Sequence, residues 1–189
     1  MDEQQAADAD TLILVDENDR DVGRMSKARC HDGDGVLHRA FSLLIFNPRG
    51  ELLLQQRAAG KRLWPLYWSN SCCSHPRAGE DMQTATRRRL DEELGLACEL
   101  QFLFKFQYQA RFEAQGSENE LCWVFIGCSG HTPRVNAVEI LAWRWVDPDA
   151  LQAEMDSAGA ARFTPWFLTE WTRIREHHWG AVRGLRASA

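Results

Sequence analysis

A regular alternation of apolar and polar side chains marks the clearest strand in the chain. Between residues 100 and 109, Leu100 and the aromatic residues at every second position alternate with mostly polar neighbours, which is the period of two typical of an extended strand. We expect the aromatic face to lie in the core and Tyr108 to place its hydroxyl at the rim of a pocket. Residues 121–126 and 141–146 predict further strands, the first apolar enough to be buried on both faces.

Three short apolar runs predict strands in the N-terminal third of the chain. Residues 11–15 form the first run. Residues 41–46 and 51–56 flank the turn 47–50, whose sequence Asn-Pro-Arg-Gly is rich in turn formers. We therefore expect an antiparallel hairpin around this turn.

Two helices are predicted from apolar spacing and from residues that begin or end helices. The first covers residues 79–95, with an apolar stripe on one face, Arg and Glu on the other, and Gly95 to end it. The second starts at Pro165 after the capping residue Thr164, and we expect it to end at Gly180. Because the helices are few among many strands, they are expected to flank a sheet.

Length and composition indicate one globular domain. The chain has 189 residues, of which 44% are hydrophobic and 26% charged, and a chain of this kind can bury one substantial core. We expect a single domain over residues 11–180, between a flexible acidic tail at 1–10 and a C-terminal tail at 181–189. The first of these tails lacks the basic start and apolar stretch of a secretory signal.

Charge and cysteine content limit the partners and the compartment. The net charge of −5 and the pI near 5.7 argue against binding to nucleic acid. The longest apolar run, residues 121–128, is too short to span a bilayer. A chain of this size does not need disulfides, so its six cysteines predict reduced thiols and a cytoplasmic location. The oligomeric state stays open between a monomer and a weak dimer.

Residues 69–76 and the acidic helix end at 92–95 carry the most informative side chains. Cys73 and His75 stand two positions apart, so both project to the same side of an extended backbone, whereas Cys72 projects to the other. A thiol and an imidazole beside a carboxylate-bearing helix suit a metal bound together with a diphosphate. This combination points to chemistry on a phosphorylated small molecule.

The helix over residues 79–95 resembles the Nudix box, a helix signature that ends in Glu-Glu-x-Gly. It departs from the box at Ser74, where the box has its first Gly, and at Arg89, where the box has Glu. Nudix hydrolases use the carboxylates of this helix to hold divalent cations that activate water. Arg89 should therefore weaken hydrolysis and improve binding to phosphate. The box is matched at Glu80, Arg88, Leu90, Glu92, Glu93, Gly95 and Leu96.

Further motifs occur in one order along the chain, and that order with its spacing is more specific than any single motif. They are 31–38, Leu63-Trp64-Pro65, 68–76, 92–95, Glu118-Asn119-Glu120 and Thr164-Pro165-Trp166. In these motifs the sequence resembles type I isopentenyl diphosphate isomerases, which move a carbon–carbon double bond without cutting the diphosphate. The resemblance covers residues 11–175 and implies an α/β fold, a Nudix-type sandwich in which a mixed β-sheet is flanked by α-helices.

The resemblance implies two metal sites. Glu93 would hold Mg²⁺ against the substrate diphosphate, because Mg²⁺ usually binds through one or two carboxylates and phosphate oxygens. A second site with three imidazoles and two carboxylates would suit Mn²⁺ or Zn²⁺, and the sequence leaves that choice open. The ligands of this second site would be His31, His38, His75, Glu118 and Glu120.

The resemblance also implies the catalytic and substrate-binding residues. Cys73 and Glu120, assisted by Tyr108, would protonate and deprotonate the alkene from opposite sides, in an order that stays open. Trp166 would offer a π face to the carbocation, with a core residue as the alternative interpretation. The substrate diphosphate would be bound by Lys27, Arg57, Lys61 and Arg89, for which a solvated surface is the alternative. Cys98, Cys122 and Cys128 are interpreted as small buried hydrophobes.

Three functions compete at this point. The first is an isomerase that interconverts isopentenyl diphosphate and dimethylallyl diphosphate, with a small prenyl diphosphate as its partner. The second is an ordinary Nudix hydrolase, favoured by Glu80, Glu92 and Glu93 but disfavoured by Arg89. The third is a diphosphate sensor without activity. It is disfavoured because the candidate catalytic and metal-binding residues Cys73, His75, Glu118 and Glu120 are all present. An assay for the allylic product distinguishes all three.

Overall fold

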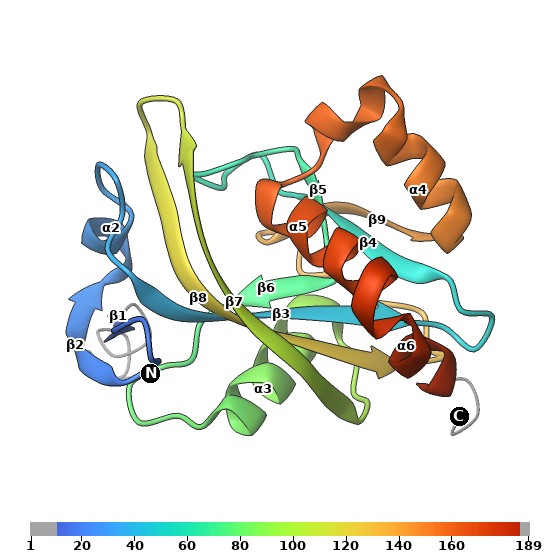
Figure 1. Cartoon of the computed structure of the whole chain (residues 1–189), viewed down its shortest axis with the longest axis horizontal. Coiled ribbons are helices and arrows are strands. Elements are labelled where there is room, and N and C mark those ends of the chain that lie inside the picture. The colour runs from blue at the N-terminus through green and yellow to red at the C-terminus, as the bar shows by residue number, and fades with distance from the viewer. Residues whose placement is uncertain (1–10, 186–189) are drawn as a thin grey trace.

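The computed structural model describes residues 11–185, which form a nine-stranded mixed sheet with helices on both faces (Figure 1). The strands are β1 (Thr11–Val15), β2 (Asp21–Ser26), β3 (His38–Phe46), β4 (Leu52–Arg57), β5 (Trp68–Ser69), β6 (Cys72–Ser74), β7 (Leu100–Phe112), β8 (Gly116–Cys128) and β9 (Ile140–Val146). The helices are α2 (Lys27–Cys30), α3 (Met82–Leu94), α4 (Pro148–Asp156), the 3₁₀ helix η1 (Ala158–Arg162), α5 (Pro165–Arg173), the π-helical segment η2 (Ile174–His178) and α6 (Trp179–Leu185).

Strand β3 organises the sheet. On one side it pairs in parallel with β8, so that His38 lies opposite Glu120. On the other side it pairs antiparallel with β6, so that Ser42 lies opposite Cys73. Strand β7 then pairs antiparallel with β8 in a long hairpin. Because paired residues point to the same face of a sheet, this register brings residues from four strands to one surface.

The predicted hairpin at residues 41–56 is confirmed only next to its turn. Phe46 pairs with Leu52, and Gly50 donates a backbone hydrogen bond of 2.7 Å to the Asn47 carbonyl. Beyond that pair the strands separate because Ser71 inserts between them. Its hydroxyl accepts from the Ile45 N–H at 2.8 Å and donates to the Leu53 carbonyl at 2.7 Å. The turn residues at 47–50 give no indication of this insertion, because Ser71 lies outside that stretch of sequence.

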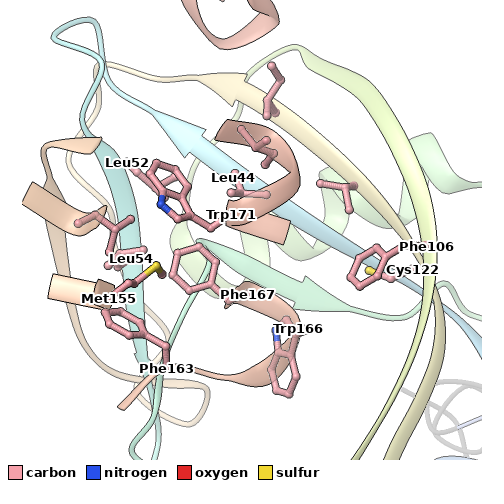
Figure 2. Packing of buried hydrophobic residues seen from close by; sticks show 14 of the residues in the cluster. Leu44, Leu52, Leu54, Phe106, Cys122, Met155, Phe163, Trp166, Phe167 and Trp171 are labelled. Carbon is pink, nitrogen blue, oxygen red and sulfur yellow. The ribbon is translucent and has the colours of Figure 1, made fainter. Parts of the chain in front are cut away.

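Alternate residues of β3 bury against different helices, which produces two cores. On one face, Phe167 and Trp171 of α5 pack over Leu44, Leu52 and Leu54 (Figure 2). Truncating either aromatic residue to Ala would destabilise the fold by about 3 to 5 kcal/mol. The other face is covered by α3, whose Leu90 and Leu94 pack against Phe41 and Leu43. The predicted sandwich is confirmed.

The first predicted helix is confirmed and is capped at both ends. Asp81 accepts a hydrogen bond of 2.7 Å from the Thr84 backbone N–H, which satisfies one of the free N–H groups of the first turn. Gly95 adopts φ 60°, ψ 30° and ends the helix, a conformation in which glycine has no Cβ to strain. The cap leaves Glu93 buried on the sheet side of α3.

Two expectations from periodicity were wrong. Phe102 is 44% exposed rather than core, because a bulge between Phe102 and Phe104 shifts the alternation and turns Phe102 toward Trp123.

The C-terminal helix does not end at Gly180 but continues through α6. Val182 is buried in the core on this face, and its packing extends the helix beyond the glycine.

The predicted division into one domain over residues 11–180 with two tails stays a prediction. Residues 1–10 and 186–189 lie outside the described part of the chain. Within residues 11–185, no helix is both long enough and apolar enough to cross a membrane.

Candidate active site and metal centre

Most of the predicted site residues line a single cavity of about 310 Å³, which lies where β6, β7, β8 and the loop before β5 meet. These residues are Cys73, Tyr108, Glu118, Glu120, His31, His75, Lys27, Arg57, Lys61 and Trp166. His38 is fully buried and does not line this cavity. Arg89 lines a neighbouring cavity of about 200 Å³ that shares Lys27, Ser74 and His75 with the first.

Three imidazoles and two carboxylates converge at one end of the cavity. One nitrogen or oxygen from each of His31, His38, His75, Glu118 and Glu120 lies within 4.8 Å of all the others. His31 Nε2 is 2.8 Å from a Glu118 oxygen, and His75 Nε2 is 3.0 Å from Glu120 Oε1. His38 Nε2 approaches His75 Nε2 to 3.1 Å. Two ring nitrogens that face each other so closely favour a cation that both can bind.

The outer ring nitrogens fix the orientation of two imidazoles. His38 Nδ1 is 2.8 Å from the Val36 carbonyl, and His31 Nδ1 is 2.6 Å from the Lys27 carbonyl. A carbonyl can only accept, so in both rings Nδ1 carries a proton and donates, and Nε2 is the nitrogen that faces the cluster. The donor set therefore fits a divalent transition metal better than Mg²⁺.

The backbone explains how residues distant in sequence meet here. Glu118 and Glu120 are two apart on β8 and project to one face. His31 follows α2, and its carbonyl accepts a hydrogen bond of 3.0 Å from the Ser117 N–H. Ser117 also donates through its hydroxyl to the Gly33 carbonyl at 2.7 Å. These bonds tie the loop after α2 to the β7–β8 hairpin.

The two candidate proton-transfer groups face the same cavity from different strands. Tyr108 donates a hydrogen bond of 2.6 Å to Glu120 Oε2. Burial opposes the charge of Glu120, but hydrogen bonds with His38 and His75 hold its pKa well below the usual range. Burial raises the pKa of Cys73 to about 12, and nearby carboxylates add to the increase, so this side chain is a thiol.

Arg57 and Trp166 form the wall next to Cys73. Arg57 donates to the Trp64 and Leu63 carbonyls at 3.1 and 2.9 Å and lies 3.9 Å from the Cys73 sulfur. Trp64 itself adopts φ 45°, a left-handed conformation that is strained for a non-glycine residue. Trp166 donates from its indole to Ser69 Oγ at 3.1 Å and is only 3% exposed. The aromatic ring is thus held rigidly at the cavity.

The remaining predicted residues, Arg89 and Glu93, belong to a partly buried ionic network at the second cavity, which Arg89 and Glu139 line. Arg89 contacts Glu93 and also donates to Glu139 at 3.0 Å, while Lys61 contacts the other oxygen of Glu139. Glu93 is 3% exposed and does not line either cavity. Arg89 and Glu93 stand four residues apart on α3 and form an i,i+4 ion pair within this larger cluster.

The sequence does not predict three residues of the site. Arg62 lines the cavity and donates to the Ala28 and Gln115 carbonyls and to Asp32, joining three segments around the opening. Glu139 is the shared partner of Lys61 and Arg89. The Cys30 sulfur is 3.3 Å from His38 Nδ1. Each lies in a loop or short helix without a repeating pattern, so no periodicity signals these contacts.

The fold and the clustered ligands define a Nudix-fold protein with a candidate metal centre. In agreement, residues 36–167 match the NUDIX domain family. The chain is 42% identical over 171 residues to isopentenyl-diphosphate Delta-isomerase 1 of Photorhabdus laumondii, covering 89% of this chain and 97% of the relative. It is 46% identical to the isopentenyl-diphosphate Delta-isomerase of Burkholderia multivorans, covering 82% and 88%. The chain belongs to the Nudix family and, within it, to the isopentenyl-diphosphate Delta-isomerases.

Solved structures support the fold. A crystal structure of a Deinococcus radiodurans protein superposes with a TM-score of 0.64 at 25% identity, covering 78% of this chain and 89% of that one. A MutT NUDIX hydrolase from Burkholderia pseudomallei superposes with a TM-score of 0.58 at 20% identity, covering 73% and 98%. The second likeness shows the fold alone.

Proposed function

We propose that this protein is an isopentenyl-diphosphate Delta-isomerase, which interconverts isopentenyl diphosphate and dimethylallyl diphosphate. Its curated relatives carry that name at 42% and 46% identity over most of the chain. The observation that carries the proposal is that Cys73 and the Tyr108–Glu120 pair line one cavity from different strands. Such a cavity lets a five-carbon alkene lie between two groups able to exchange protons.

The proton transfers are assigned to Cys73 and Glu120. One adds a proton to the terminal carbon of the double bond, which leaves a tertiary carbocation. The other removes a proton from the carbon on the opposite side of the cationic centre. Tyr108 donates to one oxygen of Glu120 and so directs the other oxygen toward the imidazoles.

The imidazole–carboxylate cluster would hold a divalent metal, Mn²⁺ or Zn²⁺. When bound, this ion supplies positive charge that keeps the neighbouring carboxylates ionised. The chain itself contributes the rigid frame: the Val36 and Lys27 carbonyls hold two rings in position. Tyr108 holds the far oxygen of Glu120, so that the carboxylate is oriented from both sides.

The diphosphate would be bound by Lys27, Arg57, Lys61 and Arg89, with Mg²⁺ held by Glu93. In the described structure Arg89 and Lys61 are neutralised by Glu93 and Glu139. A diphosphate would compete with these carboxylates for the two cations. A Mg²⁺ arriving with the substrate would compensate the carboxylate charge that is released, and one carboxylate with phosphate oxygens is a usual Mg²⁺ ligand set.

The cavity wall suits a reactive cation. Water would capture a tertiary carbocation, so the site has to exclude it. Trp166 is held by its indole hydrogen bond, and its ring centroid is 6.0 Å from that of Tyr108. The faces of these rings would stabilise positive charge without acting as nucleophiles. Cys73 has to stay a free thiol for this chemistry, so we place the protein in a reducing compartment, the cytoplasm.

The test is conversion of isopentenyl diphosphate by the purified protein with added Mg²⁺ and Mn²⁺. We expect dimethylallyl diphosphate to form with uptake of solvent deuterium and without release of phosphate. Cys73→Ala should abolish both product and deuterium uptake while diphosphate binding persists. Cys98→Ala, which changes a thiol outside the cavity, is the matched control. Release of a monophosphate instead of an allylic product would favour the hydrolase, and near-normal turnover by Cys73→Ala would falsify the role of that thiol.

A further inference from the structure

A buried carboxyl group lies behind the reactive thiol and takes no part in the roles described so far. Glu170 is 0% exposed on α5, one helical turn after Trp166, so both side chains leave the same face of the helix. Trp166 reaches the cavity. Figure 2 shows Trp166 on α5 and Cys122 on the sheet that α5 covers.

Glu170 contacts the sheet where the catalytic strands meet. The Cys122 thiol is 3.9 Å from Glu170 Oε1 and 3.5 Å from the Ser42 hydroxyl. Ser42 lies directly opposite Cys73 in the β3–β6 ladder, and paired residues point to one face. Glu170 therefore contacts Cys122, Cys122 contacts Ser42, and Ser42 pairs with Cys73 on β6.

No cation faces this carboxyl group. Over residues 11–185, Glu170 has no ion pair, and its Oε2 has no hydrogen-bond partner. The titratable groups that face it are Glu120 and Cys122 on β8 and Cys73 on β6. A buried carboxylate without a cation is costly. Burial, reinforced by Glu120, raises the pKa of Glu170 to about 8, although Ser42 and Cys122 oppose the increase.

We propose that Glu170, in its uncharged acid form, is a positioning residue of the isomerase site. Its carboxyl group supports Ser42 and Cys122 from behind, and it holds α5 against the sheet so that Cys73 and Trp166 keep their places around the substrate. Ionisation of Glu170 would put an uncompensated charge between α5 and the sheet and loosen that contact. This inference rests on the proposed function, because it assigns a role within the same site.

The acid form has a pH dependence with a defined sign. The carboxyl pKa of Glu170 is near 4.5 in the unfolded chain and about 8 in the folded one. The contribution of Glu170 to the stability of the fold is therefore greatest below pH 4.5, and it decreases as pH rises from 4.5 to 8. Activity that depends on the acid form should decline above the folded pKa, by about tenfold per pH unit.

The test compares Glu170→Gln, which keeps shape and hydrogen bonding but cannot ionise, with Glu170→Ala. Glu176→Gln, an exposed carboxyl on the following helical segment, is the matched control. We expect Glu170→Gln to keep kcat within about twofold at pH 7 and to lack the alkaline decline of the natural protein. Glu170→Ala should lower kcat by about tenfold or more with KM nearly unchanged, because the reacting groups are misplaced.

A second measurement does not depend on activity. The Tm of Glu170→Gln should exceed that of the natural protein at pH 8 by more than at pH 5. An alkaline decline that is identical in Glu170→Gln and the natural protein would overturn the proposal, as would full kcat in Glu170→Ala. If Glu170→Ala fails to fold, the pH profile of Glu170→Gln decides. If the natural protein makes no allylic product, the proposed function fails, and the Tm comparison still tests whether Glu170 is buried as an acid.

Discussion

Tyr108 donates a hydrogen bond of 2.6 Å to Glu120, the residue directly opposite it in the β7–β8 ladder. Glu120 is buried and Tyr108 is half-buried, and the phenol stays protonated because desolvation and the charge of Glu120 raise the pKa of Tyr108 well above its usual value. One oxygen of Glu120 thus has a fixed donor while the other faces His75. The cross-strand register, rather than a flexible loop, sets this geometry.

Removing the Tyr108 hydroxyl should slow turnover. Tyr108→Phe keeps the ring but deletes a hydrogen bond to a charged group, which is worth about 1.5 to 3 kcal/mol. We expect kcat to fall by about tenfold to a hundredfold, with substrate affinity little changed. Steady-state kinetics of allylic product formation measure the effect. Tyr67→Phe, which changes the only other tyrosine and lies outside the cavity lining, should leave kcat as it is; equal losses in both variants would contradict the assignment.

The imidazole–carboxylate cluster should bind metal through Glu118. Glu118→Gln replaces an anionic ligand by a neutral amide that binds divalent ions weakly, so the metal content of the purified protein should fall well below one ion per chain. Elemental analysis measures the content directly, without reliance on activity. Glu99→Gln changes a carboxylate that is 95% exposed and should retain the metal. An unchanged metal content in Glu118→Gln would remove Glu118 from the site.

Gly116 should be essential for the loop that carries His31. It adopts φ +139°, and a Cβ there would lie 2.1 Å from the His31 carbonyl oxygen. Gly116→Ala therefore has to displace that loop, and we expect about 1 to 3 kcal/mol of destabilisation together with loss of bound metal. Chemical unfolding and elemental analysis on the same samples test both parts.

Gly180→Ala is the control for this change. No atom lies within 4 Å of a Cβ built at Gly180, which is helical. Alanine should stabilise that helix by about 0.5 to 1 kcal/mol and leave the metal in place. A Gly116→Ala protein that behaves like Gly180→Ala would show that the close approach to His31 is unimportant.

The Lys61–Glu139–Arg89 network should give the protein an acid-sensitive component of stability. Burial opposes the charge of Glu139, but Lys61 and Arg89 lower its pKa from 4.5 to about 2. The stabilisation is therefore complete above pH 4.5 and is lost as pH falls toward 2. Allowing for solvent screening, it amounts to about 1 to 2 kcal/mol. In Glu139→Gln the free energy of unfolding should lack this decline, which urea unfolding at pH 5 and pH 3 can detect.

Local sequence patterns predict a large part of the fold and of the site. The apolar stripe and Gly95 predict α3, the period of two predicts β7, and the continuous apolar run at 121–126 predicts part of β8, because these patterns depend on side chains a few residues apart. The spacing of Cys73 and His75 predicts that both project to one side, and both line the cavity. The ligand set around Glu118 and Glu120 is implied by the resemblance to a known family rather than by residue spacing. The predictions of α3, β7 and the common side of Cys73 and His75 depend only on residues close in sequence, so they can be made without knowledge of the fold.

Other features depend on contacts between distant segments. The bulge that exposes Phe102, the insertion of Ser71 between β3 and β4, and the helix that continues past Gly180 all arise from packing that overrides local preference. Glu139 joins Lys61 and Arg89, and Glu170 comes to lie behind Cys73, only because the sheet register and α5 bring them together. Burial and unpaired charge, which change the pKa of such groups, are properties of the packed chain and cannot be read from residue spacing.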